Sequence, residues 1–364
     1  MTISQRRDRL RRRLYAAELD AMLVTDLVNV RYLSGFTGSN AALLIHVDDD
    51  VPVLATDGRY VTQAARQAPD AEIVIERACA PHLTGRAREA KVHRLGFESH
   101  VVTVDGYAVL AQAAGDMELV RAAGTVEALR EVKDAGEIAL LRLACEAADA
   151  ALTDLVATGG LRPGRTEKEV GRELESRMLD HGADGISFET IVAAGVNSAI
   201  PHHRPTDAIL AAGDFVKIDF GALVAGYHSD MTRTFVLSPV AQWQSELYDL
   251  VATAQRAGRD ALIPGVALSA VDEASRQIIA DAGHAEHFGH GLGHGVGLQI
   301  HEAPGISASA AGTLLPGSAV TVEPGVYLPG RGGVRIEDTL VVGSDGTPTP
   351  ELLTRFPKEL AVLD

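Results

Sequence analysis

The sequence predicts an α/β protein of about two domains, and three observations support this. Short apolar runs alternate with helical patterns through the first third of the chain. Two helices followed by several strands then occur twice in the remainder. The 364 residues are 46% hydrophobic and 23% charged, which is typical of globular proteins with well-filled cores.

The first third of the chain contains five apolar segments that read as strands, with helical patterns between them. The helical patterns cover residues 3–18, 59–68 and 105–114. This alternation indicates an α/β layer structure. The predicted strands are DAMLVTD (20–26), NAALLIHVD (40–48), VPVLATD (51–57), AEIVIER (71–77) and HRLGFES (93–99).

A domain boundary is expected near 121–136, which is polar and lacks strand character. Beyond it we expect two helices, the second starting with a capping box formed by Thr166 and Glu169. If the two helix-and-strand halves are related by a pseudo-two-fold axis, their sheets would join into one curved sheet whose concave face holds the site. The predicted helices cover 134–157, 166–181, 242–261 and 268–282, and the predicted strands cover 186–195, 214–237, 294–301, 319–327 and 333–342.

The charge and cysteine content exclude several classes of protein. A net charge of −16 argues against nucleic-acid and anionic-membrane partners, which require a basic face. The sequence has no run of about 18 apolar residues, so no transmembrane helix is expected. The arginine-rich first residues lack the apolar core of a secretory signal. The only cysteines, Cys79 and Cys145, do not form a disulfide framework, so we expect a cytoplasmic protein.

The segment GHGLGHGVGLQIHE (289–302) places three histidines among five glycines. Each glycine would cost about 1 kcal/mol inside a helix, so the segment is expected to be extended and closely approached by other backbone. On a strand, His290 and His294 share a face and His301 does not. Either a bulge intervenes or His301 approaches the site from another side.

Four acidic residues interrupt otherwise apolar, β-branched strands: Asp219, Asp230, Glu323 and Glu337. A hairpin could bring the first two into one pocket. Buried carboxylates are costly unless they are paired or bind metal. Four of them beside an imidazole form an oxygen-rich site that suits Mn²⁺, with Co²⁺ or Zn²⁺ as alternatives. Two ions about 3.5–4 Å apart would balance this charge, hold a bridging hydroxide and polarise a carbonyl for hydrolysis.

Several motifs in order resemble the Xaa-Pro peptidases, the aminopeptidase P and prolidase group of metallopeptidase family M24. The motifs are NVRYLSGFTGSNA, TDGRYVTQA, EALREVKDAGEIALLRLACEAAD, NSAIPHH, KIDFGALVAGYHSDMTRTF, GHGLGHGVGLQIHE, TVEPGVYLPG and GGVRIEDT. The resemblance covers nearly the whole chain. It implies a ribonuclease-H-like, creatinase-type amino-terminal domain (1–125) and a pita-bread catalytic domain (126–364).

The resemblance also implies roles for individual residues. The metal ligands would be Asp219, Asp230, His294, Glu323 and Glu337, and they would hold two divalent ions. The catalytic residues would be His202, His301, Glu323, which would also carry a proton, and Arg335. Substrate would be bound by His202, His290, His301 and Arg335.

The implied activity is hydrolysis of the Xaa-Pro bond of dipeptides or short peptides with a free amino terminus. The alternatives are an aminopeptidase of the same fold without proline preference, and a catalytically silent binding protein. A dipeptidase must also close on the substrate carboxylate, for which Arg204, Arg331 and Arg335 are candidates. We further expect a homodimer.

Overall fold

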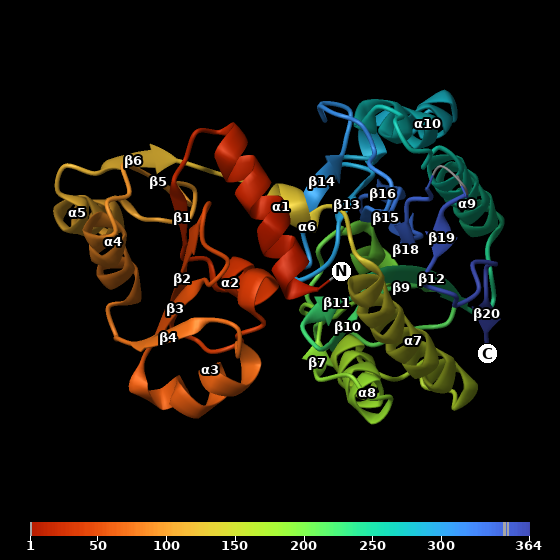
Figure 1. The fold of residues 1–364 in the computed structure, drawn as a ribbon. Helices are drawn as coiled ribbons and strands as arrows, with labels where there is room; N and C mark the ends of the chain where they lie inside the picture. Colours follow the sequence, from red (N-terminus) through yellow and green to blue (C-terminus); the bar gives the residue numbers. More distant parts are fainter. Residues whose placement is uncertain (1, 345–346, 348) are drawn as a thin grey trace. The chain divides into compact units, whose positions relative to one another are not determined.

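The chain forms two compact units, Met1–Arg130 and Glu131–Asp364. They are seen in a computed structural model that describes residues 2–344, 347 and 349–364 (Figure 1). No helix within those residues is long and apolar enough to cross a membrane.

The first unit is built on one mixed sheet of six strands in the order β4-β3-β2-β1-β5-β6. The strands are β1 (Ala21–Val24), β2 (Ala41–His46), β3 (Val53–Thr56), β4 (Glu72–Ile75), β5 (Arg94–Phe97) and β6 (Glu118–Arg121). The helices are α1 (Ile3–Ala16), α2 (Leu27–Ser34), α3 (Val61–Gln67), α4 (Cys79–Glu89), α5 (Val104–Ala114) and α6 (Glu127–Arg130). The five predicted strands and three predicted helices are therefore present.

Sequence analysis missed α2, α4, α6 and β6. Helix α4 contains Pro81 and Gly85, which are poor helix formers, but Pro81 lies in the first turn, where its missing N–H costs little. Helix α2 has only eight residues and is delimited by the Asp26 N-cap and by Gly35 in the left-handed conformation. These elements follow from caps and tertiary packing more than from periodicity.

The second unit contains two helix pairs, each followed by strands, as the sequence predicts. Helices α7 (Ala135–Ala157) and α8 (Glu167–Asp180) form one pair, and α9 (Gln242–Asp260) and α10 (Leu268–Asp281) form the other (Figure 1). The predicted capping box at Thr166 is present. Each pair packs its apolar face on its own sheet, which gives two separate hydrophobic cores.

The strands of this unit form two larger sheets, in the orders β20-β12-β9-β8 and β14-β13-β15-β18-β19, and two small ones. They are β7 (Gly185–Ile186), β8 (Ile191–Ala194), β9 (Phe215–Phe220), β10 (Ala222–Val224), β11 (Tyr227–His228), β12 (Met231–Leu237), β13 (Gly293–Gly295), β14 (Glu302–Ile306), β15 (Ala319–Val322), β16 (Gly325–Leu328), β17 (Gly332–Arg335), β18 (Asp338–Val341), β19 (Glu351–Leu352) and β20 (Val362–Leu363).

The two larger sheets do not form one uninterrupted ladder, because the strands are interrupted where the acidic residues lie. Glu323 separates β15 from β16, and Glu337 lies between β17 and β18. Hydrogen bonds nevertheless join the two larger sheets, since the Glu337 amide donates to the Thr232 carbonyl at 3.1 Å and Thr339 Oγ1 donates to the Asp230 carbonyl at 2.8 Å. These junctions bring the acidic residues of both halves together.

The predicted strand 294–301 is also shorter than expected. Residues 296–301 form a turn between β13 and β14, in which the Gly297 amide donates to the Gln299 carbonyl. The glycines of β13 allow the close approach that the sequence predicted. A Cβ atom at Gly293 would overlap the Thr321 carbonyl oxygen, and one at Gly295 would overlap the Ala303 carbonyl oxygen.

We predict that Gly295→Ala destabilises the protein, because β13 must move away from β14 to admit the methyl group. The free energy of unfolding should fall by about 1–3 kcal/mol, measured by urea denaturation. Gly289→Ala is the matched control, since a Cβ atom there has no neighbour within 4 Å. Equal stability losses in the two variants would contradict the explanation.

Candidate metal centre and active site

One cavity of about 760 Å³ in the second unit collects every residue that the resemblance implies for metal binding, catalysis and substrate binding. Its volume is within the range of small-molecule sites. The predicted residues that line it are His202, Asp219, Asp230, His290, His294, His301, Glu323, Arg335 and Glu337.

The candidate ligands occupy strand ends and strand breaks more often than strand interiors. Among the four carboxylates only Asp219 lies within a strand, β9, where Val216, Ile218 and Phe220 face a hydrophobic core. His294 is the middle residue of the short strand β13. Asp230 directly precedes β12, and Glu323 and Glu337 lie in strand breaks. Carboxylates at strand breaks can turn toward a common point without burying a polar group in either core.

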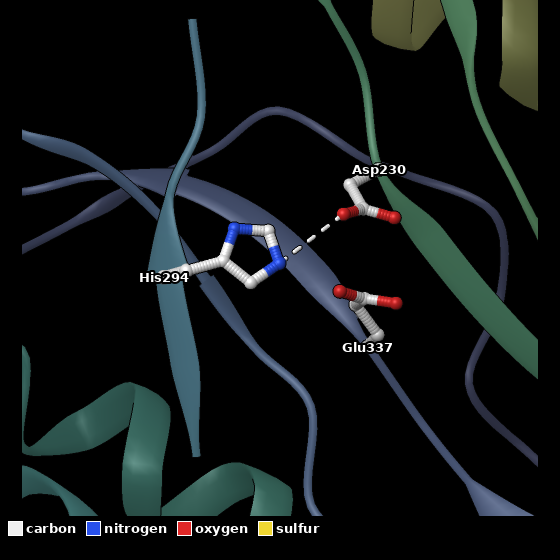
Figure 2. A group of neighbouring side chains, drawn as sticks. All are labelled: Asp230, His294 and Glu337. Carbon is white, nitrogen blue, oxygen red and sulfur yellow. Dashed lines mark ion pairs between the residues drawn. The ribbon is translucent and has the colours of Figure 1, made fainter. Parts of the chain in front are cut away.

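Three of the candidate ligands are especially close to one another. One ligand atom each from Asp230, His294 and Glu337 lies within 4.8 Å of the other two (Figure 2). His294 Nδ1 hydrogen-bonds to the Gly295 carbonyl at 3.0 Å, so this nitrogen carries the proton and Nε2 keeps its lone pair. Nε2 lies 3.5 Å from Asp230 Oδ2 and 3.4 Å from Glu323 Oε1. The imidazole is thus oriented as a metal ligand.

Asp219 has one oxygen engaged and one free. Its Oδ2 forms an ion pair with Arg335 Nη2. Its Oδ1 is buried, and among the described residues it has no hydrogen-bond partner. A buried carboxylate oxygen without a partner carries a large desolvation cost, and a cation at this point would remove it.

The pKa values of the carboxyl groups show the same lack of compensating charge. Burial, together with the charges of Glu337, Asp219 and Glu323, raises the pKa of Asp230 well above its usual range. Burial, together with the charges of Glu323 and Asp219, does the same for Glu337. Burial raises the pKa of Glu323 to about 8, against the opposing charge of Arg335. The residues present therefore fit divalent cations, which would relieve this repulsion.

The histidines have different surroundings. His202 and His301 are exposed in the cavity. His290 Nδ1 hydrogen-bonds to the Gly291 carbonyl at 2.8 Å, and its Nε2 lies 2.9 Å from the Tyr327 hydroxyl, so both ring nitrogens are occupied. Burial lowers the pKa of His290 and of His294 to about 4, and burial also lowers the pKa of His301. The imidazoles of His290 and His294 are therefore neutral near pH 7.

The structure resolves the two alternatives for the parity of His301. The pairing of β13 with β14 shifts register between His294 and Gly295, as in a β-bulge. The turn 296–301 then reverses the chain, and the ring of His301 lies edge-on to that of His294 with centroids 4.4 Å apart. The bulge and the reversal together bring both rings to one cavity.

Sequence analysis missed three residues that organise the site. The Tyr327 hydroxyl accepts a hydrogen bond from Arg335 Nη1 at 2.8 Å and donates to His290. Thr232 Oγ1 accepts from Arg335 Nε at 3.0 Å and donates to Glu337 Oε2 at 2.7 Å. Lys217 is fully buried. Its position, on the same side of the strand as Asp219, was visible in the alternation of VKIDF, but its partners were not.

The three arginines considered for the substrate carboxylate are also distinguished. Arg335 is buried and is committed to Asp219, Thr232, Tyr327 and the Pro201 carbonyl. Arg331 stacks on Trp243 and does not line the cavity. Arg204 lines the cavity and pairs with Glu189 at 2.7 Å, with both side chains largely exposed.

Comparison with known proteins gives matches over both units. Residues 139–344 match the model of metallopeptidase family M24, and residues 6–132 match that of the creatinase/prolidase N-terminal domain. An uncharacterized peptidase of Bacillus subtilis, YqhT, is 40% identical over 95% of this chain and 96% of its own length. The structure of a Xaa-Pro dipeptidase from Bacillus anthracis matches with a TM-score of 0.93 and 38% identity, and each chain is covered completely.

A second similar structure is that of an X-Pro aminopeptidase from Thermotoga maritima, with a TM-score of 0.89 and 33% identity over 98% of this chain and 99% of that one. The fold and the site thus define a hydrolase of the metallopeptidase class. The chain belongs to metallopeptidase family M24, with a creatinase/prolidase amino-terminal domain. The predicted fold class and family are confirmed, and the family implies divalent metal ions.

We predict that the metal-free protein loses stability as pH rises toward 8. The folded-state pKa of Glu323 is about 8, and the pKa of a glutamate in the unfolded chain is lower. At pH values between the two, the folded state therefore keeps a proton that the unfolded state has lost. The free energy of unfolding therefore falls as that proton is lost. Chelator-treated protein should melt at a lower temperature at about pH 8.5 than at about pH 7, where the buried histidines have already lost their protons.

Two controls test the cause of that loss. The metal-free Glu323→Gln variant should show a weaker dependence on pH over the same interval, because the titrating group is gone. Restoring a divalent ion to the wild-type protein should also weaken it, since the cation offsets the carboxylate charges. A chelated wild-type protein that melts at the same temperature at both pH values would contradict the prediction.

Proposed function

We propose that this protein hydrolyses the Xaa-Pro bond of dipeptides or short peptides with a free amino terminus. The observation that carries the proposal is the convergence of four carboxylates and His294 on one cavity, with a buried Asp219 oxygen left without a hydrogen-bond partner among the described residues. The similarity to proteins named Xaa-Pro dipeptidase and X-Pro aminopeptidase supports the choice of bond.

We further propose that residues 126–364 form the catalytic domain and residues 1–125 the accessory amino-terminal domain. The cavity and its candidate ligands belong to the second of these ranges. The two cysteines are free and buried, which suits a reducing compartment such as the cytoplasm. A homodimer is proposed as the oligomeric state.

Two divalent ions, with Mn²⁺ as the proposed metal, would be held by Asp219, Asp230, His294, Glu323 and Glu337. The oxygen-rich donor set favours a hard ion over a thiophilic one. When bound, such ions polarise a carbonyl and supply a nucleophile at neutral pH. The protein contributes the fixed ligands, the orientation of His294 through the Gly295 carbonyl, and the cavity.

The cavity has complementary polar and apolar walls. Its acidic end would attract the ammonium group at the substrate's amino terminus. The side chains of Ile186, Phe188, Ile191, Pro205 and Ile300 also line it, and they offer an apolar surface for a proline ring. Because a proline nitrogen has no N–H to donate, such a ring must be held by shape and apolar contact.

The chain's own groups can move the protons that peptide hydrolysis requires. His202 and His301 face the cavity, and a neutral imidazole can donate its N–H to the oxyanion that develops on the substrate carbonyl. Glu323 can pass a proton to the leaving proline nitrogen, because a carboxyl group in the cavity can take up the proton of the nucleophile and release it again. The contacts of Arg335 with Asp219 and Thr232 keep the carboxylates fixed during these transfers.

We predict that Ala-Pro is cleaved and that acetyl-Ala-Pro is not, because the acidic cavity selects a free ammonium group. Release of proline from metal-loaded protein can be measured by amino-acid analysis. Ala-Ala is the matched substrate control. Faster cleavage of Ala-Ala than of Ala-Pro would overturn the proline assignment in favour of an aminopeptidase of other preference.

Substrate length is tested with the same assay. Of the three candidate arginines, Arg204 alone has a guanidinium that both lines the cavity and lies largely exposed, so we propose that it pairs with the carboxylate of a dipeptide. Arg204→Ala should raise the KM of Ala-Pro by only about 3- to 10-fold, because exposed ion pairs are weak, and should leave the KM of Ala-Pro-amide unchanged. Equal effects on both substrates would exclude this role.

We predict that ligand and proton-transfer residues separate when turnover and metal content are measured together. His202→Ala and His301→Ala should lower kcat by about 10²–10⁴-fold and retain metal. Asp230→Ala and Glu337→Ala should lower both metal content and turnover. Metal loss in the two histidine variants, measured by elemental analysis after dialysis, would reverse the assignment.

A further inference from the structure

The segment that carries His202 has little regular structure of its own. It leaves β8 at Ala194, passes through the short 3₁₀ helix Gly195–Ala199 and a turn at 201–202, and continues without regular structure to Thr206. His202 is exposed in the cavity. A side chain on such a segment keeps its orientation only if the backbone is fixed from outside.

Lys217 fixes the middle of this segment. Its Nζ donates to three carbonyl oxygens that immediately precede His202: those of Ser198 at 3.1 Å, Ile200 at 2.6 Å and Pro201 at 3.3 Å. A protonated lysine has three N–H donors, one for each of these acceptors. The same Nζ lies over the ring of Tyr327, 5.0 Å from its centroid.

A lysine at this position carries a desolvation cost. It is fully buried in β9, and burial with the charge of Arg335 lowers its pKa, whereas the three carbonyl oxygens favour the protonated amine. An apolar side chain of similar length would avoid the desolvation cost. Stability alone therefore does not account for a lysine here, whereas fixing three carbonyl groups within the four residues ahead of His202 does.

Both ends of the segment are fixed separately by Glu167 of α8, which is fully buried. Its carboxylate accepts hydrogen bonds from the Ala194 amide, Asn197 Nδ2, His203 Nε2 and both the amide and the hydroxyl of Thr206. Loss of the lysine contacts would thus loosen the middle of the segment while its ends stay attached.

We infer that Lys217 is a positioning residue that holds His202 at the reacting carbonyl by fixing the Ser198, Ile200 and Pro201 carbonyl groups. The inference rests on the proposed hydrolase function for its kinetic test, though not on the proline preference. Lys217 touches neither substrate nor metal in this account and acts entirely through the backbone of the segment.

A double-mutant cycle tests this dependence on His202. Lys217→Met should lower kcat/KM about 10- to 100-fold, within the range of coupling between neighbouring residues, and should retain metal. In the His202→Ala background the same substitution should change kcat/KM by less than about 2-fold, because the residue it positions is gone. An equal loss in both backgrounds, or loss of metal from Lys217→Met, would overturn the inference.

Lys358→Met provides a matched control, because it removes another substantially buried lysine, which pairs with Asp338 at 2.6 Å. Any decrease in kcat/KM that Lys358→Met causes should be the same in the wild-type and His202→Ala backgrounds. If Lys217→Met does not fold, Ser198→Ala loosens the same segment by removing a hydroxyl that accepts from the Gly333 amide and donates to the Gly195 carbonyl. The same non-additivity with His202→Ala is expected for it.

Hydrogen exchange gives a readout that does not need activity. In Lys217→Met the amides of residues 198–200, 202 and 203 should exchange faster, and those of β9 and β12 should be unchanged. The kinetic cycle can use whichever peptide the wild-type protein cleaves best, so failure of the proline assignment is distinguishable from failure of this inference. Unchanged exchange at residues 198–200, 202 and 203 would contradict it even in the absence of any hydrolysis.

Discussion

The repulsion among four carboxylates, three of them buried and Glu323 partly buried, is the constraint on which the catalytic unit depends. Asp219, Asp230, Glu323 and Glu337 share one cavity, and Arg335 pairs directly with Asp219. Neither hydrophobic core of the unit could contain these charges. The strands instead break or end at three of the four positions, so that each carboxylate turns toward the cavity while the neighbouring apolar side chains remain in the cores. The fold is thereby arranged around a charge that only cations can balance.

Periodicity and composition predict the layers of this fold well. The alternation in VKIDF identifies the core-facing and site-facing sides of β9, and the helix pairs follow from their caps and apolar spacing. Strand ends are less predictable. The Pro324-Gly325 pair does indicate that a strand stops after Glu323, whereas Ile336-Glu337 continues an apolar pattern on both sides of a break. The break at Glu337 depends on a hydrogen bond to Thr232, about one hundred positions away, and single-sequence patterns contain no information on it.

The candidate site also contains residues that the sequence predicts and residues that it does not. Acidic and imidazole side chains in apolar strands are rare enough to be noticed, and the family resemblance added His202 and Arg335. All nine predicted residues line one cavity. Tyr327, Thr232 and Lys217 were missed because a tyrosine, a threonine or a lysine is ordinary in sequence. They become informative only when their partners are known: an arginine, a carboxylate and three carbonyl groups. The roles of individual histidines likewise depend on which ring nitrogen is already bonded to a carbonyl or a phenol.

The contacts of Arg335 have a thermodynamic consequence. One rigid guanidinium touches Asp219 and Thr232 on the side of the candidate ligands, and Tyr327 and the Pro201 carbonyl on the side of His290 and His202. The candidate metal ligands and the histidines of the peptide site therefore contact the same side chain, so a shift of Arg335 would affect both. Linkage requires that any factor by which bound cations change the affinity for a peptide is equal to the factor by which the peptide changes the affinity for the cations. Occupancy of the ion sites and of the peptide site would then form one cooperative equilibrium, with this guanidinium as the physical connection.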